Sequence, residues 1–152
     1  MSKAIRIHAH GGPEVLKWEQ VPTPQPGPNE VLVKHEAVGL NFIDVYFRTG
    51  LYKAALPTTL GMEGAGVVRA VGEKVKGFAP GERVAYAGGA LGAYATERVI
   101  NAEKLVKLPD HIDSKTAAAM MLQGLTAYFL LHRTYKLQPG QTILVHAAAG
   151  GV

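Results

Sequence analysis

Glycine and proline interrupt this chain along its whole length, and they limit how long any regular element can be. The 152 residues include 18 Gly and 9 Pro. Both residue types favour turns and disfavour the interiors of helices and strands, so this density predicts short strands rather than a helical bundle. Residues 22–28 hold four prolines and a glycine, which predicts a surface loop.

Hydrophobic patterning predicts where those strands lie. Apolar and polar residues alternate over 3–9, as in a half-buried strand. The segment 60–72 combines valines with closely spaced glycines, which suits a tightly bent barrel strand. The strands expected before residue 110 are 3–9, 15–20, 30–40, 60–72, 84–86, 93–99 and 103–108.

Two helices are also expected. The first covers 41–49, with Asn41 as its N-cap, Asp44 in its first turn and Gly50 at its end. The second begins at Lys115, after a cap at Asp113 or Ser114, and extends to about Tyr135.

The last twelve residues change pattern again. Residues 142–146 form a continuous apolar run, which is typical of a buried parallel strand, and they lead into Gly150 and Gly151. A strand followed by a glycine turn is how a dinucleotide-binding βαβ unit begins. Alone the signal is weak, because a plain turn of small residues explains it equally well. Such a unit takes about 30 residues or more, so this chain does not build one by itself.

Composition narrows the class of protein. Apolar residues make up 47% and charged residues 18%, which is enough to bury one globular core. The net charge of +4 comes from cations scattered from Lys3 to Lys136, a spacing that argues against a nucleic-acid-binding stripe. No apolar stretch approaches the ~20 residues that span a bilayer, and the start lacks the apolar region of a signal peptide. We therefore expect a soluble cytoplasmic protein with no membrane partner.

Four segments carry a resemblance to a known family. They are HGGPEVL at 10–16, GLNFIDVYFRTGLY at 39–52, GMEGAGVV at 61–68 and GQTILVHAAAGGV at 140–152. In this order the chain resembles the amino-terminal half of NADPH-dependent quinone oxidoreductases. These form the zeta-crystallin-like, zinc-free branch of the medium-chain dehydrogenase/reductase superfamily.

The resemblance implies a fold. It is a β-rich α+β architecture, with an incomplete GroES-like barrel as the catalytic domain. A connecting helix and the first strand of a truncated Rossmann domain would follow. Residues 1–123 would be the amino-terminal part of the catalytic domain, and residues 124–152 the start of the nucleotide-binding domain.

The resemblance also implies an activity, namely hydride transfer from NADPH to a quinone in an interdomain cleft. The intact protein would be a homo-oligomer, a dimer in the family, and the 152 residues alone would be inactive. Catalytic positions would be Asn41, Asp44, Tyr46 and Tyr52. Cofactor-binding positions would be Asn41, Phe42, Ile43, Tyr46, Gln123, Thr126, Gly150, Gly151 and Val152.

Each of these residues has an ordinary structural explanation as well. Asn41 and Asp44 could simply cap a helix, and the two tyrosines could pack on the barrel surface, where a phenol is a poor acid. Gln123 and Thr126 could be ordinary helix polarity. Arg48 is expected to pair with Asp44 at the surface rather than to bind phosphate. His146 is expected to be structural.

The residue types argue against a metal cofactor. The chain has no cysteine, and the turn Gly61-Met62-Glu63 offers a thioether where zinc-dependent relatives in the superfamily have an imidazole. A thioether is a poor zinc ligand, and Glu63 alone is not a site. We therefore expect no metal.

Two other classes of function remain open at this point. One is a free-standing GroES-like interaction module without catalysis. The other is nucleic-acid binding through the positive net charge. Within the module, residues 142–147 would be an apolar strand without a sheet to join, which predicts self-association or a disordered end.

Overall fold

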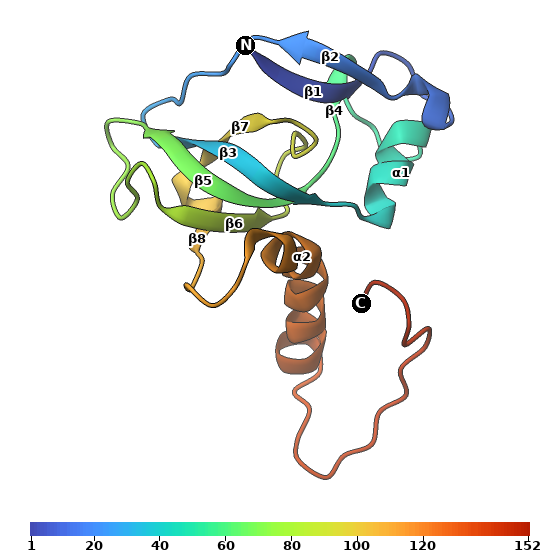
Figure 1. The fold of residues 1–152 in the computed structure, drawn as a ribbon. Helices are drawn as coiled ribbons and strands as arrows, with labels where there is room; N and C mark the ends of the chain where they lie inside the picture. The colour runs from blue at the N-terminus through green and yellow to red at the C-terminus, as the bar shows by residue number, and fades with distance from the viewer.

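Two antiparallel sheets form the body of the molecule, and one long helix extends from it (Figure 1). The computed structural model describes residues 1–152. The smaller sheet has the order β2-β1-β4, with β1 Ser2–Ile7, β2 Lys17–Val21 and β4 Thr58–Thr59. The larger sheet has the order β7-β3-β5-β6-β8, with β3 Glu30–Gly39, β5 Glu63–Val71, β6 Arg83–Ala87, β7 Glu97–Asn101 and β8 Val106–Lys107. The expected β-rich α+β class is confirmed.

Two α-helices flank these sheets. Helix α1 is Phe42–Thr49 and helix α2 is Ser114–Phe129, followed by a π-helical turn at Leu130–Thr134. Single 3-10 turns occur at Pro13–Val15 and Ala102–Lys104. The expected helix over 41–49 is confirmed, and so is the start of the second helix, where the Asp113 side chain accepts a hydrogen bond from the Thr116 N–H.

The larger sheet encloses the main core. Val31, Val33, Val68, Val84 and Tyr86 are buried within it. On the other side of β5 and β6, small residues let helix α2 approach closely: Ala65 and Ala85 pack against Ala117 and Ala118. The first turns of α2 are therefore fixed to the sheet by alanine contacts.

Tyr94 to Thr96 joins the two sheets. The Ile5 N–H donates to the Tyr94 carbonyl at 2.7 Å, and the Thr96 N–H donates to the Lys3 carbonyl at 2.8 Å. The His35 N–H donates to the Thr96 carbonyl at 2.9 Å, so the same segment also reaches β3. This linker holds β1 against the end of the larger sheet.

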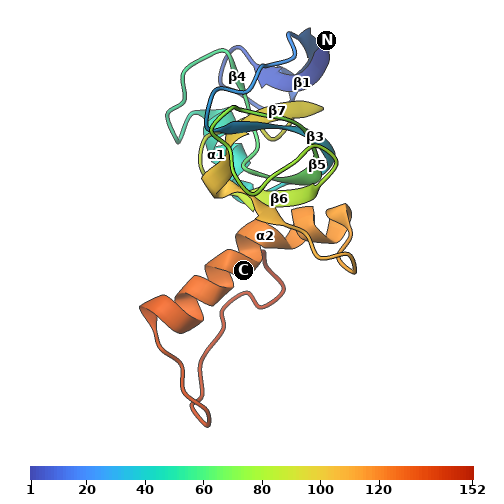
Figure 2. The ribbon, with the colours of Figure 1, turned by 90° about the vertical axis from the view of Figure 1, so that its left-hand side faces the viewer.

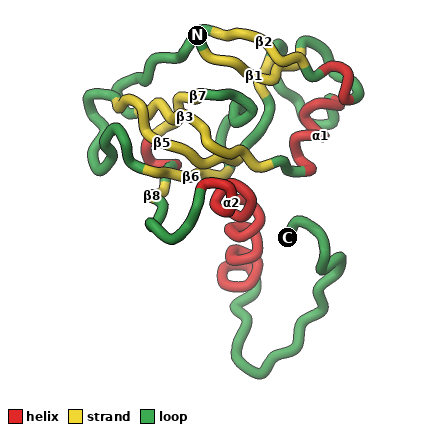
Figure 3. The backbone as a smooth tube through the Cα atoms, viewed as in Figure 1, coloured by secondary structure: helices red, strands yellow, loops and turns green.

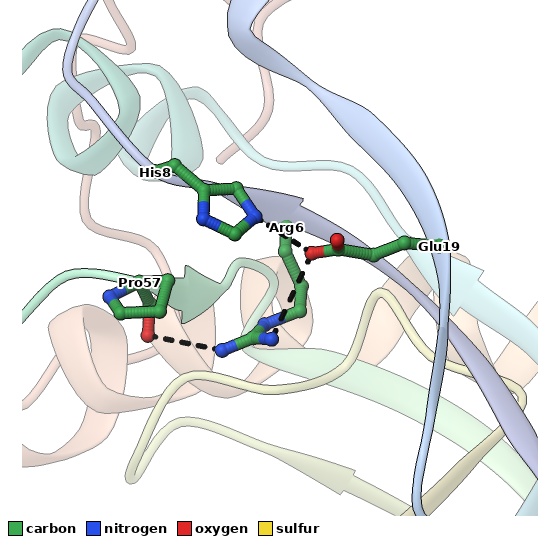
Figure 4. A network of polar contacts seen from close by, with 4 residues as sticks. All are labelled: Arg6, His8, Glu19 and Pro57. Atoms are coloured by element: carbon green, nitrogen blue, oxygen red, sulfur yellow. Dashed lines mark hydrogen bonds and ion pairs between the residues drawn. The ribbon is translucent and has the colours of Figure 1, made fainter.

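A polar network ties the smaller sheet together (Figure 4). Glu19 Oε1 on β2 lies 2.9 Å from His8 Nε2 and 3.7 Å from Arg6 Nη1. Arg6 Nη2 in turn donates to the Pro57 carbonyl just before β4, at 3.4 Å. All three side chains are solvent-accessible, so the network adds little to stability.

Two of the expected strands are placed differently in the structure. The strand expected over 93–99 forms only from Glu97, because Tyr94 to Thr96 is used as the linker between the sheets. The strand expected over 103–108 is reduced to Val106–Lys107, since Ala102–Lys104 forms a 3-10 turn. The short strand β4 was not expected.

The end of the chain corrects a further prediction. Residues 142–146 form no strand, and Figure 3 shows this part as a loop that turns back toward α2. A parallel strand needs a neighbouring strand to satisfy its backbone groups, and no other strand of the structure lies along this segment. Figure 2 shows α2 leaving the sheets with this loop beside it. The expected boundary between the two domain parts, after residue 123, lies inside α2. That domain boundary stays a prediction.

Candidate functional site

The start of α1 is the centre of the candidate site. Asn41 is the N-cap, and the Asp44 carboxylate accepts a hydrogen bond from the Asn41 N–H at 3.0 Å. Gly50 ends the helix in the left-handed conformation, with φ of 85°, which glycine adopts without strain. Both polar residues are buried, so this short helix is anchored firmly at its first turn.

Glu63 lies beneath this helix start. It is the first residue of β5 and is 1% exposed. Its Oε2 accepts a hydrogen bond from Asn41 Nδ2 at 2.7 Å, and its Oε1 accepts one from the Leu122 N–H at 2.6 Å. One carboxylate therefore connects β5, the cap of α1 and the middle of α2.

A glycine makes room for that carboxylate. Gly39 on β3 pairs directly with Glu63. A Cβ at residue 39 would lie 2.7 Å from Glu63 Cδ, and closer still to Glu63 Oε2 and the Ala118 carbonyl. Only a residue without a side chain allows α2 and Glu63 to lie where they do.

Asp44 has a second partner in Tyr94. The Tyr94 hydroxyl donates to Asp44 Oδ2 at 2.7 Å. Burial, together with the Asp44 carboxylate, raises the pKa of Tyr94 far above its ordinary value. This hydroxyl thus remains a hydrogen-bond donor and does not act as an acid.

Arg48 does not form the expected pair with Asp44. No ion pair joins them, and Arg48 Nε and Asp44 Oδ1 are both buried without a hydrogen-bond partner. Both residues line a cavity of ≈ 60 Å³ between α1 and Tyr94. The prediction of an exposed i,i+4 pair was wrong, because Asp44 turns inward to Asn41 and Tyr94.

Four aromatic rings cover the outer side of α1. Phe42 and Tyr46 meet edge to face at 5.3 Å, and Tyr46 and Tyr52 lie 5.2 Å apart between ring centroids. Phe47 meets Tyr52 at 5.5 Å. Phe42 is 69% exposed and Tyr52 44%, so these rings form an aromatic surface that is open to solvent. Ile43 is partly buried in the same first turn.

The expected cofactor contacts on α2, Gln123 and Thr126, follow Leu122, the residue whose N–H donates to Glu63. Gln123 directly follows Leu122, and the Thr126 hydroxyl donates to the Leu122 carbonyl at 2.8 Å. A Cβ at Gly151 would lie 3.5 Å from Gln123 Nε2, so the glycine turn passes beside this amide. Gly150 and Val152 are exposed in the same turn.

Sequence reasoning missed the partners of these residues. Glu63, Tyr94 and the pair His35 and Tyr86 were not assigned a role in the site. A charged residue at the start of a glycine- and valine-rich strand was the available signal for Glu63. For Tyr94 there was none, since its partner lies 50 positions away.

His35, which is partly buried, and the buried Tyr86 form a hydrogen-bonded pair near the site. His35 Nδ1 lies 2.6 Å from the Ala95 carbonyl, and Nε2 lies 2.7 Å from the Tyr86 hydroxyl. A carbonyl can only accept, so Nδ1 carries the proton and Nε2 accepts from Tyr86. Burial lowers the pKa of His35 and raises that of Tyr86, so both stay neutral.

The structure has neither a cluster of metal-binding side chains nor a helix that could span a membrane. No group of three or more His, Asp or Glu side chains is arranged to hold a metal ion. No helix has both the length and the apolar character needed to cross a bilayer.

Comparisons with known proteins match this architecture. The family described as "Alcohol dehydrogenase GroES-like domain" matches residues 27–110. The quinone oxidoreductase of Pseudomonas aeruginosa is 58% identical over 100% of this chain and 47% of its own length. The chain thus spans about half the length of the curated relatives it matches.

Solved structures agree with the sequence matches. A crystal structure of quinone oxidoreductase from Pseudomonas syringae pathovar tomato superposes with a TM-score of 0.96 at 53% identity, over 99% of this chain and 47% of that one. Escherichia coli quinone oxidoreductase complexed with NADPH gives 0.89 at 46% identity, over 93% and 43%. The resemblance inferred from the four sequence segments is confirmed.

Proposed function

Because the chain belongs to the alcohol dehydrogenase GroES-like domain family, we propose that it provides the substrate side of an NADPH-dependent quinone oxidoreductase that uses no zinc. The observation that carries this proposal is the exposed aromatic surface of α1 directly above the buried Asn41, Asp44 and Glu63 cluster. The relatives named quinone oxidoreductase, one of them solved with NADPH, support it.

The residues present fit a nicotinamide group. Such a ring needs a flat apolar surface and hydrogen-bond partners for its carboxamide, and Phe42, Tyr46 and the Gln123 amide offer both. Gly151 leaves space beside Gln123 where a side chain would stand. When bound, NADPH supplies a hydride from its nicotinamide ring. The proposed contacts are Asn41, Phe42, Ile43, Tyr46, Gln123, Thr126, Gly150, Gly151 and Val152.

The aromatic surface suits a quinone equally well. A flat quinone ring stacks on tyrosine, and the hydroxyls of Tyr46 and Tyr52 can donate hydrogen bonds to its oxygens. These donors stabilise the negative charge that develops on a quinone oxygen as it accepts a hydride. A proton from solvent then completes the hydroquinone. In this proposal the protein positions the two rings and excludes water while the hydride is transferred, before solvent supplies the proton.

The donor set of the chain favours chemistry without zinc. Met62 stands in the turn before β5 and offers only a thioether, a poor zinc ligand. Both oxygens of the neighbouring Glu63 are engaged by Asn41 and Leu122. A quinone accepts a hydride without a metal to stabilise an alkoxide, so none is needed for this reaction.

The test is NADPH oxidation by a soluble benzoquinone, followed through the nicotinamide absorbance. We expect the protein at its natural length to be active and the 152 residues alone to be inactive. Tyr52→Ala is expected to raise the KM for quinone about tenfold, whereas Tyr52→Phe, which keeps the ring, should raise it no more than about threefold. A wild-type protein that leaves NADPH unchanged would refute the proposal. We further propose that the intact protein is cytoplasmic and forms a homo-oligomer.

A further inference from the structure

We propose that Glu63 is a positioning residue that aligns the Asn41 amide with helix α2, so that two segments of the site move as one unit. This inference depends on the proposed function only for the identity of the ligand, NADPH, that the two segments bind. The alignment itself rests on the contacts of one buried carboxylate.

The first contact fixes the orientation of the Asn41 side chain. A carboxylate can only accept hydrogen bonds, so Glu63 Oε2 selects the nitrogen of the Asn41 amide, 2.7 Å away. The amide oxygen is thereby turned to the other side, toward the first turn of α1. The Asp44 carboxylate, bound to the Asn41 N–H and to Tyr94, prevents the backbone from following any rotation.

The second contact reaches α2 well beyond its first turn. Glu63 Oε1 accepts from the Leu122 N–H at 2.6 Å, in the middle of a helix that begins at Ser114. This bond ties the residue just before Gln123 to the start of β5. Gln123 and Thr126 are therefore placed relative to Asn41 through a single side chain.

The length and the charge of Glu63 are both required. Aspartate is shorter by one methylene and cannot reach Asn41 and Leu122 together. Glutamine has the right length, but if its oxygen keeps the Leu122 bond, its nitrogen faces the Asn41 nitrogen. Two donors then oppose each other, and the Asn41 amide must rotate.

The test compares Glu63→Gln with Glu36→Gln in the protein at its natural length. Glu36 is the matched control, because it accepts a hydrogen bond from the Ser114 hydroxyl at 2.6 Å and also holds α2, but at the other end and without touching Asn41. NMR of the Asn41 side-chain amide and the Leu122 backbone amide reports the two contacts directly. NADPH titration reports the consequence for binding.

For Glu63→Gln we expect a large shift of the Asn41 amide signals and NADPH affinity weakened about tenfold, from the loss of one hydrogen bond to a charged group. Glu63→Asp should lose one of the two contacts. Adding Asn41→Asp to Glu63→Gln exchanges donor and acceptor, so the double variant should regain the thermal stability lost in Glu63→Gln. Glu36→Gln should leave the Asn41 signals unchanged and the affinity within about threefold.

Three results would overturn the inference. They are Asn41 signals that do not move in Glu63→Gln, no recovery of stability in the double variant, and NADPH affinity that falls equally in Glu36→Gln. If the wild-type protein binds no NADPH, the proposed function fails, and the NMR signals alone decide whether Glu63 positions Asn41.

Discussion

Replacing Gly39 with alanine should destabilise the protein strongly, although alanine is normally tolerated in a strand. A Cβ at this position would lie 2.7 Å from Glu63 Cδ, whereas ordinary contact begins at 3.4 Å. The Ala118 backbone also blocks it, so either α2 or Glu63 must move. Overpacking costs about 1–3 kcal/mol, and losing a hydrogen bond to a charged group costs about 1.5–3 kcal/mol. Together these two costs predict that the free energy of unfolding falls by about 2.5–6 kcal/mol.

Urea unfolding followed by circular dichroism measures this loss, and Gly124→Ala is the matched control. Gly124 lies in α2 with only Met120 Cε, at 3.9 Å, near the added carbon. Alanine favours a helix over glycine by about 0.5–1 kcal/mol, so Gly124→Ala should be more stable than wild type. A Gly39→Ala variant within about 0.5 kcal/mol of wild type would refute the reasoning that Gly39 makes room for Glu63 and α2.

Three further outcomes follow from the buried groups. Burial lowers the pKa of His35 below its ordinary 6.5. Below pH 6.5 the unfolded chain therefore binds a proton that the folded protein does not, so the free energy of unfolding should fall as the pH decreases. Urea unfolding at about pH 7.5 and about pH 5.5 checks this, and His35→Gln should flatten the dependence. Tyr94→Phe should lower the free energy of unfolding by about 1–2 kcal/mol, because Asp44 Oδ2 loses a donor. Asp44→Asn should lower it further, since the Asn41 N–H loses a charged acceptor. Equal stability of either variant and wild type would contradict the role of this cluster.

Local signals in the sequence predicted α1 almost to the residue. Its cap, its first-turn charge and its terminating glycine are all encoded within ten positions, and the structure confirms Asn41 and Gly50 as its two ends. The strand over 30–40 was predicted equally well, because alternation and β-branched residues are also local.

Contacts between distant segments account for the errors. Tyr94 to Thr96 has strand-like composition, but it is used to join β1 to β3, and no local pattern encodes that partner. Residues 142–146 have the composition of a buried strand, yet they meet no second strand in the structure. A strand is defined by its neighbour, so composition alone could not decide either segment.

The candidate site shows the same contrast between local signals and contacts between distant segments. The sequence grouped Asn41, Asp44, Tyr46 and Tyr52 as catalytic positions. The structure places them in the cap of α1, in the helix and just after it, and their catalytic roles stay a prediction. From the sequence, Glu63 was considered only as a possible zinc ligand, and that role was rejected. The role of Glu63 depends on Leu122, 59 positions away, and on the absence of a side chain at Gly39.

Turnover after complete removal of metal tests most directly whether this surface serves a zinc-free reductase. The protein at its natural length would be dialysed against a strong chelator and assayed for NADPH oxidation by a soluble benzoquinone. We predict that its rate is unchanged after chelation and does not rise when zinc is added. A rate that disappears with the metal and returns with zinc, or a protein that never oxidises NADPH, would contradict the assignment.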